Sequence, residues 1–161
     1  MTNSYTVAVL GSTGYVGLEL VKILLNHPNI RINFLGCENS PNLNILDFDH
    51  NIKSNYLPNL SLNDDFIPSN SDVVFLALPH GVSHTYVKKF FNKIIIIDLS
   101  ADFRLDSIDT YLSNYNNNHS CPNLLGQFIY GLPEFYSENI VNKSNIAVPG
   151  CYPTSILIPL I

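Results

Sequence analysis

The sequence predicts an α/β protein built on a doubly wound, mostly parallel sheet. Short apolar, β-branched segments alternate along the chain with segments whose apolar residues recur at helical spacing. The apolar segments are nearly continuous, which is typical of strands buried on both faces of a parallel sheet. No segment repeats another over the 161 residues. That length is enough for one domain with a substantial core.

The elements can be placed in chain order. The first helix is indicated by Val16, Leu20, Ile23 and Leu24, which lie at helical spacing. The second helix has Ser83 as its expected N-cap. The buried strands are expected from their unbroken apolar runs, and the segment 37–61 is polar and expected to be irregular. The expected strands are 5–10, 30–35, 73–78, 94–99 and 146–148, and the expected helices are 15–26, 83–91 and one that begins at residue 151.

Charge and cysteine content exclude several classes of function. The chain has 8 Lys and Arg against 13 Asp and Glu, a net charge of −5. Without a basic patch, we expect no nucleic-acid or membrane partner. Cys37, Cys121 and Cys151 are odd in number and widely spaced, which indicates a reducing compartment and predicts no metal site. Residues 1–4 carry no basic signal sequence and the apolar runs are too short to span a bilayer, so we expect a soluble, cytoplasmic protein.

A glycine-rich turn follows the first strand directly. Its spacing, G-x-x-G-x-x-G, is related to the dinucleotide-binding fingerprint, in which glycines allow a tight turn and close approach to a pyrophosphate. The required context, a strand before and an amphipathic helix after, is present. A purely structural turn is the alternative. The predicted cofactor residues here are Gly11, Ser12, Thr13, Gly14, Tyr15, Val16 and Gly17.

The residues after the second strand indicate whether the ribose of the nucleotide carries a 2′-hydroxyl or a 2′-phosphate. An acidic side chain at this place favours a free 2′-hydroxyl, whereas Arg or Ser and Thr accommodate a 2′-phosphate. Glu38 therefore points to NAD, while Asn39 and Ser40 could bind a phosphate. The alternative is that Glu38 is a solvated loop charge, so the residues alone leave the cofactor open.

Cys151 is the strongest candidate for chemistry. It lies in Pro149-Gly150-Cys151-Tyr152-Pro153-Thr154, between a short strand and a predicted helix. A cysteine at a helix N-terminus faces unpaired backbone N–H groups and the positive end of the helix dipole, which stabilise a thiolate nucleophile. The alternative is a buried structural cysteine.

Five segments together resemble the N-terminal part of the N-acetyl-gamma-glutamyl-phosphate reductase family, within the semialdehyde dehydrogenase superfamily. They occur in the family's order and spacing along the whole chain. The form Gly-Cys-Tyr-Pro-Thr is similar to this family rather than to the aspartate enzymes. The segments are Val9-Leu10-Gly11-Ser12-Thr13-Gly14-Tyr15-Val16-Gly17, Val73-Val74-Phe75-Leu76-Ala77-Leu78-Pro79-His80-Gly81-Val82-Ser83, Ile97-Asp98-Leu99-Ser100-Ala101-Asp102-Phe103-Arg104-Leu105, Tyr130-Gly131-Leu132-Pro133-Glu134 and Pro149-Gly150-Cys151-Tyr152-Pro153-Thr154.

The resemblance implies a reaction of arginine biosynthesis. In it, Cys151 attacks the acyl phosphate of N-acetyl-glutamyl phosphate, a thioester forms, and hydride reduces it to N-acetylglutamate semialdehyde. NADPH is the implied cofactor, with NADH as the alternative, because Pro41-Asn42-Leu43 stand where many family members carry a Gly-Lys pair. A non-catalytic nucleotide-binding relic and an aspartate-semialdehyde-type dehydrogenase remain as alternatives.

The resemblance also implies roles for residues that follow later strands. A loop lining the cofactor is implied for Pro79, His80 and Gly81, although a structural role for His80 is an alternative. Substrate contacts are implied for Ser100, Asp102, Arg104 and Glu134. The alternatives are an Asp102–Arg104 loop salt bridge and, for Glu134, a charge at a helix N-terminus.

The implied domain organisation is a Rossmann-like NAD(P)-binding domain over 1–148, followed at 149–161 by the catalytic-cysteine turn and the start of its helix. Family members continue with a second, α+β domain for substrate binding and dimerisation. That domain supplies an acid/base histidine and makes the full-length form a homo-oligomer acting on a small-molecule substrate. We therefore expect little or no turnover from the 161 residues alone.

Overall fold

The computed structural model describes residues 4–54 and 56–160. The chain divides into two compact units, Met1–Leu78 and Pro79–Ile161. Each unit combines parallel strands with helices, so the predicted α/β class is confirmed. The functional boundary expected between residues 148 and 149 stays a prediction.

Among its described residues, the first unit contains four parallel strands in the order β3-β2-β1-β4. The chain runs from β1 through β2 to β3 and then returns to the other side of β1, so the strand order reverses at β1. In open parallel sheets, ligands bind beyond the carboxyl ends of the strands at such a reversal. The elements are β1 (Tyr5–Leu10), α1 (Tyr15–Leu25), β2 (Ile30–Cys37), β3 (Leu60–Leu62) and β4 (Val73–Leu76).

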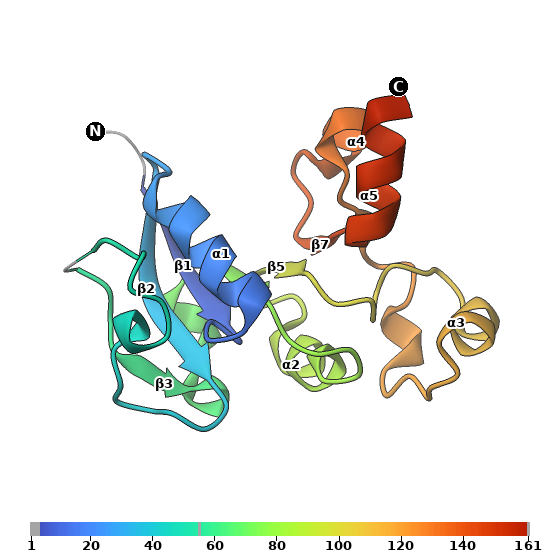
Figure 1. The fold of residues 1–161 in the computed structure, drawn as a ribbon. Helices are drawn as coiled ribbons and strands as arrows, with labels where there is room; N and C mark the ends of the chain where they lie inside the picture. The colour runs from blue at the N-terminus through green and yellow to red at the C-terminus, as the bar shows by residue number, and fades with distance from the viewer. Residues whose placement is uncertain (1–3, 55, 161) are drawn as a thin grey trace. The chain divides into compact units, whose positions relative to one another are not determined.

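Helix α1 covers β1 and β2 (Figure 1). Its buried residues Gly17, Val21 and Leu24 recur at helical spacing and turn one face toward the sheet. Val21 and Leu24 join the core cluster of this unit, whose strand residues include Val9 and Leu35. The helix closes at Asn26, whose side-chain amide donates to the carbonyl oxygen of Lys22 at 2.8 Å.

The turn between β1 and α1 is too crowded for side chains at two of its glycines. Gly11 has a φ of +76°, and a Cβ on it would overlap the carbonyl oxygen of Ala77. A Cβ on Gly17 would lie 2.7 Å from the Cα of Ser12 and overlap the carbonyl oxygen of Gly11. Glycine is therefore required at both positions for the turn to close between β4 and α1.

In the described part of the second unit, which ends at residue 160, three parallel strands lie in the order β5-β7-β6. Its core is aromatic: Phe103 stacks on Phe128 with ring centroids 4.4 Å apart, and Tyr111 is fully buried. The elements are α2 (Ser83–Phe90), β5 (Ile95–Asp98), α3 (Ile108–Tyr115), β6 (Ile129–Tyr130), α4 (Pro133–Ile140), β7 (Asn145–Ala147) and α5 (Cys151–Leu157).

Several short elements escape prediction from the sequence. Strands β3 and β6 are too short for a hydrophobic period to show, and α3 and α4 have polar faces that conceal their apolar spacing. The expected N-cap is also wrong by one residue, because the cap of α2 is Val82 and Ser83 is a buried first-turn residue. Single-turn helices complete the chain at Ile45–Asp47, Asn63–Asp65, Pro68–Asn70, Pro122–Leu124 and Ile158–Leu160.

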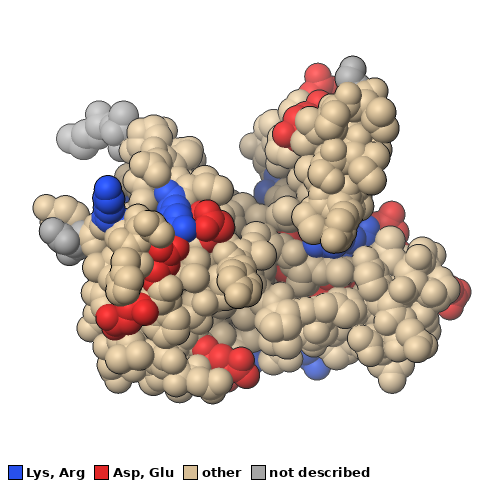
Figure 2. Space-filling view, in the orientation of Figure 1, with Lys and Arg blue, Asp and Glu red and all other residues tan. Residues whose placement is uncertain are grey.

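Charged side chains are few and scattered over the face drawn in Figure 2, where most of the surface is neither acidic nor basic. Within the described ranges, no helix is long and apolar enough to cross a membrane.

The two glycines at the start of α1 give a matched test of the turn. We expect Gly17→Ala to lower the free energy of unfolding by about 1–3 kcal/mol, because the added methyl group has no space against the turn backbone. Gly14→Ala is the control, since its Cβ would lie 3.5 Å from the Gly11 carbonyl oxygen, an ordinary contact. Urea unfolding followed by circular dichroism measures both, and equal losses would contradict the proposed crowding.

Candidate active site

The glycine-rich turn of the first unit is fixed to the end of β2 by Ser12. The backbone N–H and the hydroxyl of Ser12 both donate to the carbonyl oxygen of Gly36, at 2.8 Å and 2.9 Å. The buried side chain of Asn63 accepts the Gly11 N–H at 3.0 Å. Sequence reasoning gave no role to Asn63, which follows a strand too short to recognise. These bonds hold the turn in place before any ligand binds.

The predicted cofactor residues of this turn therefore differ in what they can do. Ser12 is fully buried and both of its donors are used within the turn, so its observed role is structural, and its contact with a cofactor stays a prediction. Gly14, Tyr15 and Val16 are exposed, and Thr13 is half-buried. The first turn of α1 has neither a side-chain cap nor an acidic residue. Its N–H groups can donate hydrogen bonds to a phosphate, so the turn fits a dinucleotide.

Glu38 and Ser40 follow the end of β2, next to this turn. Glu38 is exposed and Ser40 is half-buried. Because Gly36 is bonded to Ser12, the segment that begins at Glu38 leaves the sheet beside the glycine-rich turn. The predicted ribose-contacting residues thus lie at the carboxyl edge of the sheet.

In the second unit, the predicted loop Pro79-His80-Gly81 is held by Asp102. The Gly81 N–H donates to both carboxylate oxygens of Asp102, at 2.9 Å and 3.0 Å. The His80 Nδ1 lies 2.6 Å from Asp102 Oδ1, and its Nε2 lies 3.3 Å from the Tyr111 hydroxyl. Burial raises the pKa of Tyr111 to about 12, so its hydroxyl remains a donor. These partners fix the loop and orient the imidazole of His80.

Two further histidines complete the surroundings of Asp102. His84 Nε2 lies 3.4 Å from Asp102 Oδ2, and His84 Nδ1 accepts the Ser120 N–H. His119 Nδ1 accepts the Cys121 N–H, so its proton is on Nε2, which donates to the Asp102 carbonyl oxygen at 2.9 Å. Burial is the main cause that lowers the pKa of both His84 and His119. Both rings are buried parts of the core, and the lowered pKa values favour their neutral form.

Asp102 and Ser100, two of the predicted substrate contacts, are both buried. Asp102 has no exposed surface, and its carboxylate is surrounded by the donors described above. The Ser100 hydroxyl donates to Asp98 at 2.8 Å and accepts the Asp102 N–H at 3.1 Å. Burial raises the pKa of Asp98 to about 6. Asp102 and Ser100 therefore position the loops around them, and their contact with a substrate stays a prediction.

Arg104 joins the ends of two strands to the turn that precedes Cys151. Its Nε donates to the Val148 carbonyl oxygen at 2.8 Å and its Nη2 to that of Leu99 at 3.0 Å. The remaining nitrogen, Nη1, lies against Gly150, where a Cβ would be only 3.1 Å away. The salt bridge with Asp102 considered as an alternative is not formed, because Asp102 pairs with histidines instead. Arg104 keeps a cationic nitrogen beside the cysteine turn.

A cavity of 410 Å³ opens beside Arg104. Its lining combines this cation with the carboxylate of Asp106, the amide of Asn139 and the phenol rings of Tyr130 and Tyr136. Such a set of donors and acceptors suits a small polar ligand. Glu134 is exposed in the first turn of α4, where its charge favours the helix N-terminus.

Cys151 is the first residue of α5, as predicted. At this end of the helix, the Thr154 N–H donates to the carbonyl oxygen of the N-cap residue Gly150 at 3.1 Å. All three cysteines are free, but Cys37 and Cys121 are buried and Cys151 is exposed. The alternative of a buried structural cysteine is therefore wrong for Cys151. Across 4–54 and 56–160, no group of three or more His, Cys, Asp and Glu side chains could hold a metal ion.

Comparison with known proteins assigns this arrangement to a family. Residues 6–143 match the model of the semialdehyde dehydrogenase NAD-binding domain. The chain belongs to this semialdehyde dehydrogenase family. The nicotinamide dinucleotide indicated by the glycine-rich turn is therefore the class of cofactor that the family model names.

Two relatives show which enzymes of this family the chain is similar to. The chain is 48% identical to an N-acetyl-gamma-glutamyl-phosphate reductase of Ehrlichia canis and 44% identical to one of Clostridium botulinum, over 99% and 96% of its length. It covers 46% and 45% of these two proteins, and so spans about half the length of the curated relatives it matches. The resemblance predicted from the five segments is confirmed.

Solved structures support the semialdehyde dehydrogenase fold. Aspartate semialdehyde dehydrogenase II of Vibrio cholerae, complexed with ASA, matches with a TM-score of 0.70 at 18% identity, over 98% of this chain and 45% of that one. The Candida albicans enzyme with NADP matches with a TM-score of 0.60 at 19% identity, over 98% and 46%. At these identities the comparison shows the fold.

The neutral histidines of this semialdehyde dehydrogenase chain predict a dependence of stability on pH. Because their folded pKa values lie below the ordinary value, the unfolded chain binds more protons as the pH falls through about 6.5. We expect the free energy of unfolding to decrease between about pH 7.5 and about pH 6, by up to roughly 1.4 kcal/mol per pH unit for each histidine. Asp98 opposes this only at lower pH, between its ordinary value of 3.8 and its folded value of about 6.

Urea unfolding at the two ends of this range measures the slope. His119→Asn removes one of the titrating groups and should flatten the slope. The control His50→Asn changes an exposed histidine and should leave it unchanged. A slope that is the same in both variants would show that His119 is not responsible.

The three thiols differ in accessibility, which predicts the order of their alkylation. We expect iodoacetamide at neutral pH to modify Cys151 well before the other two, because it is exposed and they are buried. Burial also raises the pKa of Cys121 and so reduces its thiolate fraction. Peptide mapping by mass spectrometry gives the order, with Cys151→Ser as the control. Equal rates at all three sites would contradict the structure.

Proposed function

We propose that the chain carries the nucleotide-binding part and the cysteine nucleophile of an N-acetyl-gamma-glutamyl-phosphate reductase. The observation that carries the proposal is the exposed Cys151 at the first position of α5, directly after a glycine held against Arg104. In this proposal residues 1–148 form the dinucleotide domain and residues 149–161 begin the catalytic segment. The names of the relatives support the choice of substrate.

The proposed reaction begins at the Cys151 sulfur. The thiolate attacks the carbonyl carbon of the acyl phosphate, a C–S bond forms, and the C–O bond to phosphate breaks with its electron pair on the leaving phosphate. The Nη1 of Arg104 is the cation nearest the cysteine turn and would stabilise the phosphate charge as it departs. The product of this half-reaction is a thioester on Cys151.

The second half-reaction requires a reductant. A bound nicotinamide dinucleotide would supply hydride to the thioester carbonyl carbon. Cys151 then leaves as a thiolate and the semialdehyde is released, so the nucleophile is regenerated. The open N-terminus of α1 and the exposed residues Gly14 and Tyr15 would hold the dinucleotide.

The acylation step provides the test. We expect the chain incubated with N-acetyl-glutamyl phosphate, generated in place by a kinase, to gain the mass of one N-acetylglutamyl group at Cys151. Cys151→Ser should gain none, because a hydroxyl without an adjacent base is a poor nucleophile. Intact-mass and peptide mass spectrometry measure both.

Two other outcomes would change the assignment. Acylation by aspartyl phosphate in preference to N-acetyl-glutamyl phosphate would favour an aspartate-semialdehyde-type enzyme. Acylation by neither compound, with nucleotide binding intact, would favour the non-catalytic nucleotide-binding alternative.

A further inference from the structure

The acidic residue Glu38 lies at the position that contacts the ribose of the dinucleotide in dinucleotide-binding sheets. It comes two residues after Gly36, whose carbonyl oxygen accepts two hydrogen bonds from Ser12 in the glycine-rich turn. It directly follows the last residue of β2 and is exposed. In dinucleotide-binding sheets an acidic residue at this place bonds the ribose 2′-hydroxyl, whereas a nearby Arg accommodates a 2′-phosphate.

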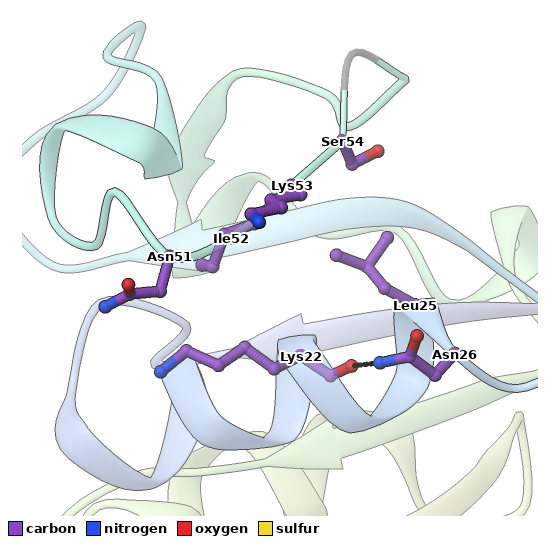
Figure 3. Close-up of a pocket in the computed structure, with 7 residues that line it drawn as sticks. All are labelled: Lys22, Leu25, Asn26, Asn51, Ile52, Lys53 and Ser54. Carbon is purple, nitrogen blue, oxygen red and sulfur yellow. Dashed lines mark hydrogen bonds between the residues drawn. The ribbon is translucent and has the colours of Figure 1, made fainter.

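The basic residues of the first unit all lie at the opposite, amino edge of its sheet. The unit contains three of them, Lys22, Arg31 and Lys53. Arg31 is the second residue of β2 and pairs with Thr6 near the start of β1. Lys22 and Lys53 line a cavity with Leu25 at the C-terminal end of α1, and this end lies near the start of β1 (Figure 3).

One of these cations, Lys22, is also partly neutralised by neighbouring carboxylates. Lys22 is bonded to Asp49 at 2.6 Å and to Glu19 at 2.7 Å. Its ammonium therefore already has two carboxylate partners. No basic residue of the first unit is left at the carboxyl edge of the sheet to bind a 2′-phosphate.

The charges at the carboxyl edge are instead acidic. Glu38 follows β2, and Asp64 and Asp65 follow the neighbouring parallel strand β3. Asn63, between that strand and the two aspartates, bonds the N–H of Gly11, so this acidic segment adjoins the glycine-rich turn. A 2′-phosphate carries between one and two negative charges at neutral pH and would be repelled here.

We propose that this site selects the unphosphorylated dinucleotide, NADH, over NADPH, and that Glu38 is the specificity-determining residue. The inference rests on the proposed function, because it concerns the ribose end of the same dinucleotide site. Glu38 accepts a hydrogen bond from the ribose 2′-hydroxyl of NADH. The same carboxylate, together with the acidic residues after β3, disfavours the 2′-phosphate of NADPH.

The test compares the two dinucleotides on the full chain. Dissociation constants follow from the fluorescence of the reduced nicotinamide at low ionic strength. We expect NADH to bind at least about tenfold more tightly than NADPH, a factor consistent with repulsion between close like charges. Added salt should reduce the ratio, because it screens the repulsion at this exposed edge.

Matched variants assign the preference to Glu38. Glu38→Gln should bring the ratio of the two dissociation constants toward one, mainly because NADPH binds more tightly. Glu19→Gln makes the same change on an exposed residue of α1 and should leave the ratio as it is. Adenosine 2′,5′-bisphosphate and AMP, used as competitors, should reproduce the preference if it arises at the ribose end.

The possible failures are distinguishable. If NADPH binds as tightly as NADH, or if Glu38→Gln leaves the ratio unchanged, the inference is overturned while the proposed nucleotide site stands. If neither dinucleotide binds, the proposed function fails and the inference with it.

Discussion

The buried carboxylate of Asp102 organises the second unit of the chain. It accepts N–H groups from Gly81 and His80 and adjoins His84, so the loop after β4 and the start of α2 both depend on it. Its own backbone is bonded to Ser100 and His119, which fix the segments on either side. A carboxylate without exposed surface is costly to bury unless such donors surround it. The network therefore fixes these loops as one arrangement, and a change in any member leaves a buried polar group without its partner.

A single carbonyl oxygen has the corresponding role in the first unit. The Gly36 oxygen accepts both the N–H and the hydroxyl of Ser12, and this joins the glycine-rich turn to the end of β2. A side chain at Gly36 would collide with Asn63, which in turn holds the N–H of Gly11. The turn is thus preorganised by residues that would not touch a ligand, and the exposed groups at the start of α1 remain available for one.

Periodicity and motifs predict the long elements and the start of the cysteine helix well. The bounds of β1 agree with those expected, α1 ends one residue early, and Cys151 begins its helix. The same reasoning fails where tertiary partners decide a role. Ser12 and Asp102 are polar residues in motif segments, and nothing local indicates that each is bonded to residues 17 to 24 positions away in the chain. Their burial appears only when the fold brings those partners together. Asn63 was missed for the same reason.

The two candidate ligand sites, one in each unit, differ in charge and therefore suit different ligand groups. In the first unit the cations lie at the amino edge of the sheet and the carboxylates of Glu38, Asp64 and Asp65 at the carboxyl edge, an arrangement suited to neutral hydroxyl groups. In the second unit, two nitrogens of Arg104 donate to backbone carbonyl oxygens, and the third lies beside Gly150. A lysine could not do this, because a single ammonium on a flexible stem cannot bridge two strand ends and still face a third position. The guanidinium is thus held rigid by the fold it supports, and a rigid cation stabilises a departing phosphate without first having to be ordered.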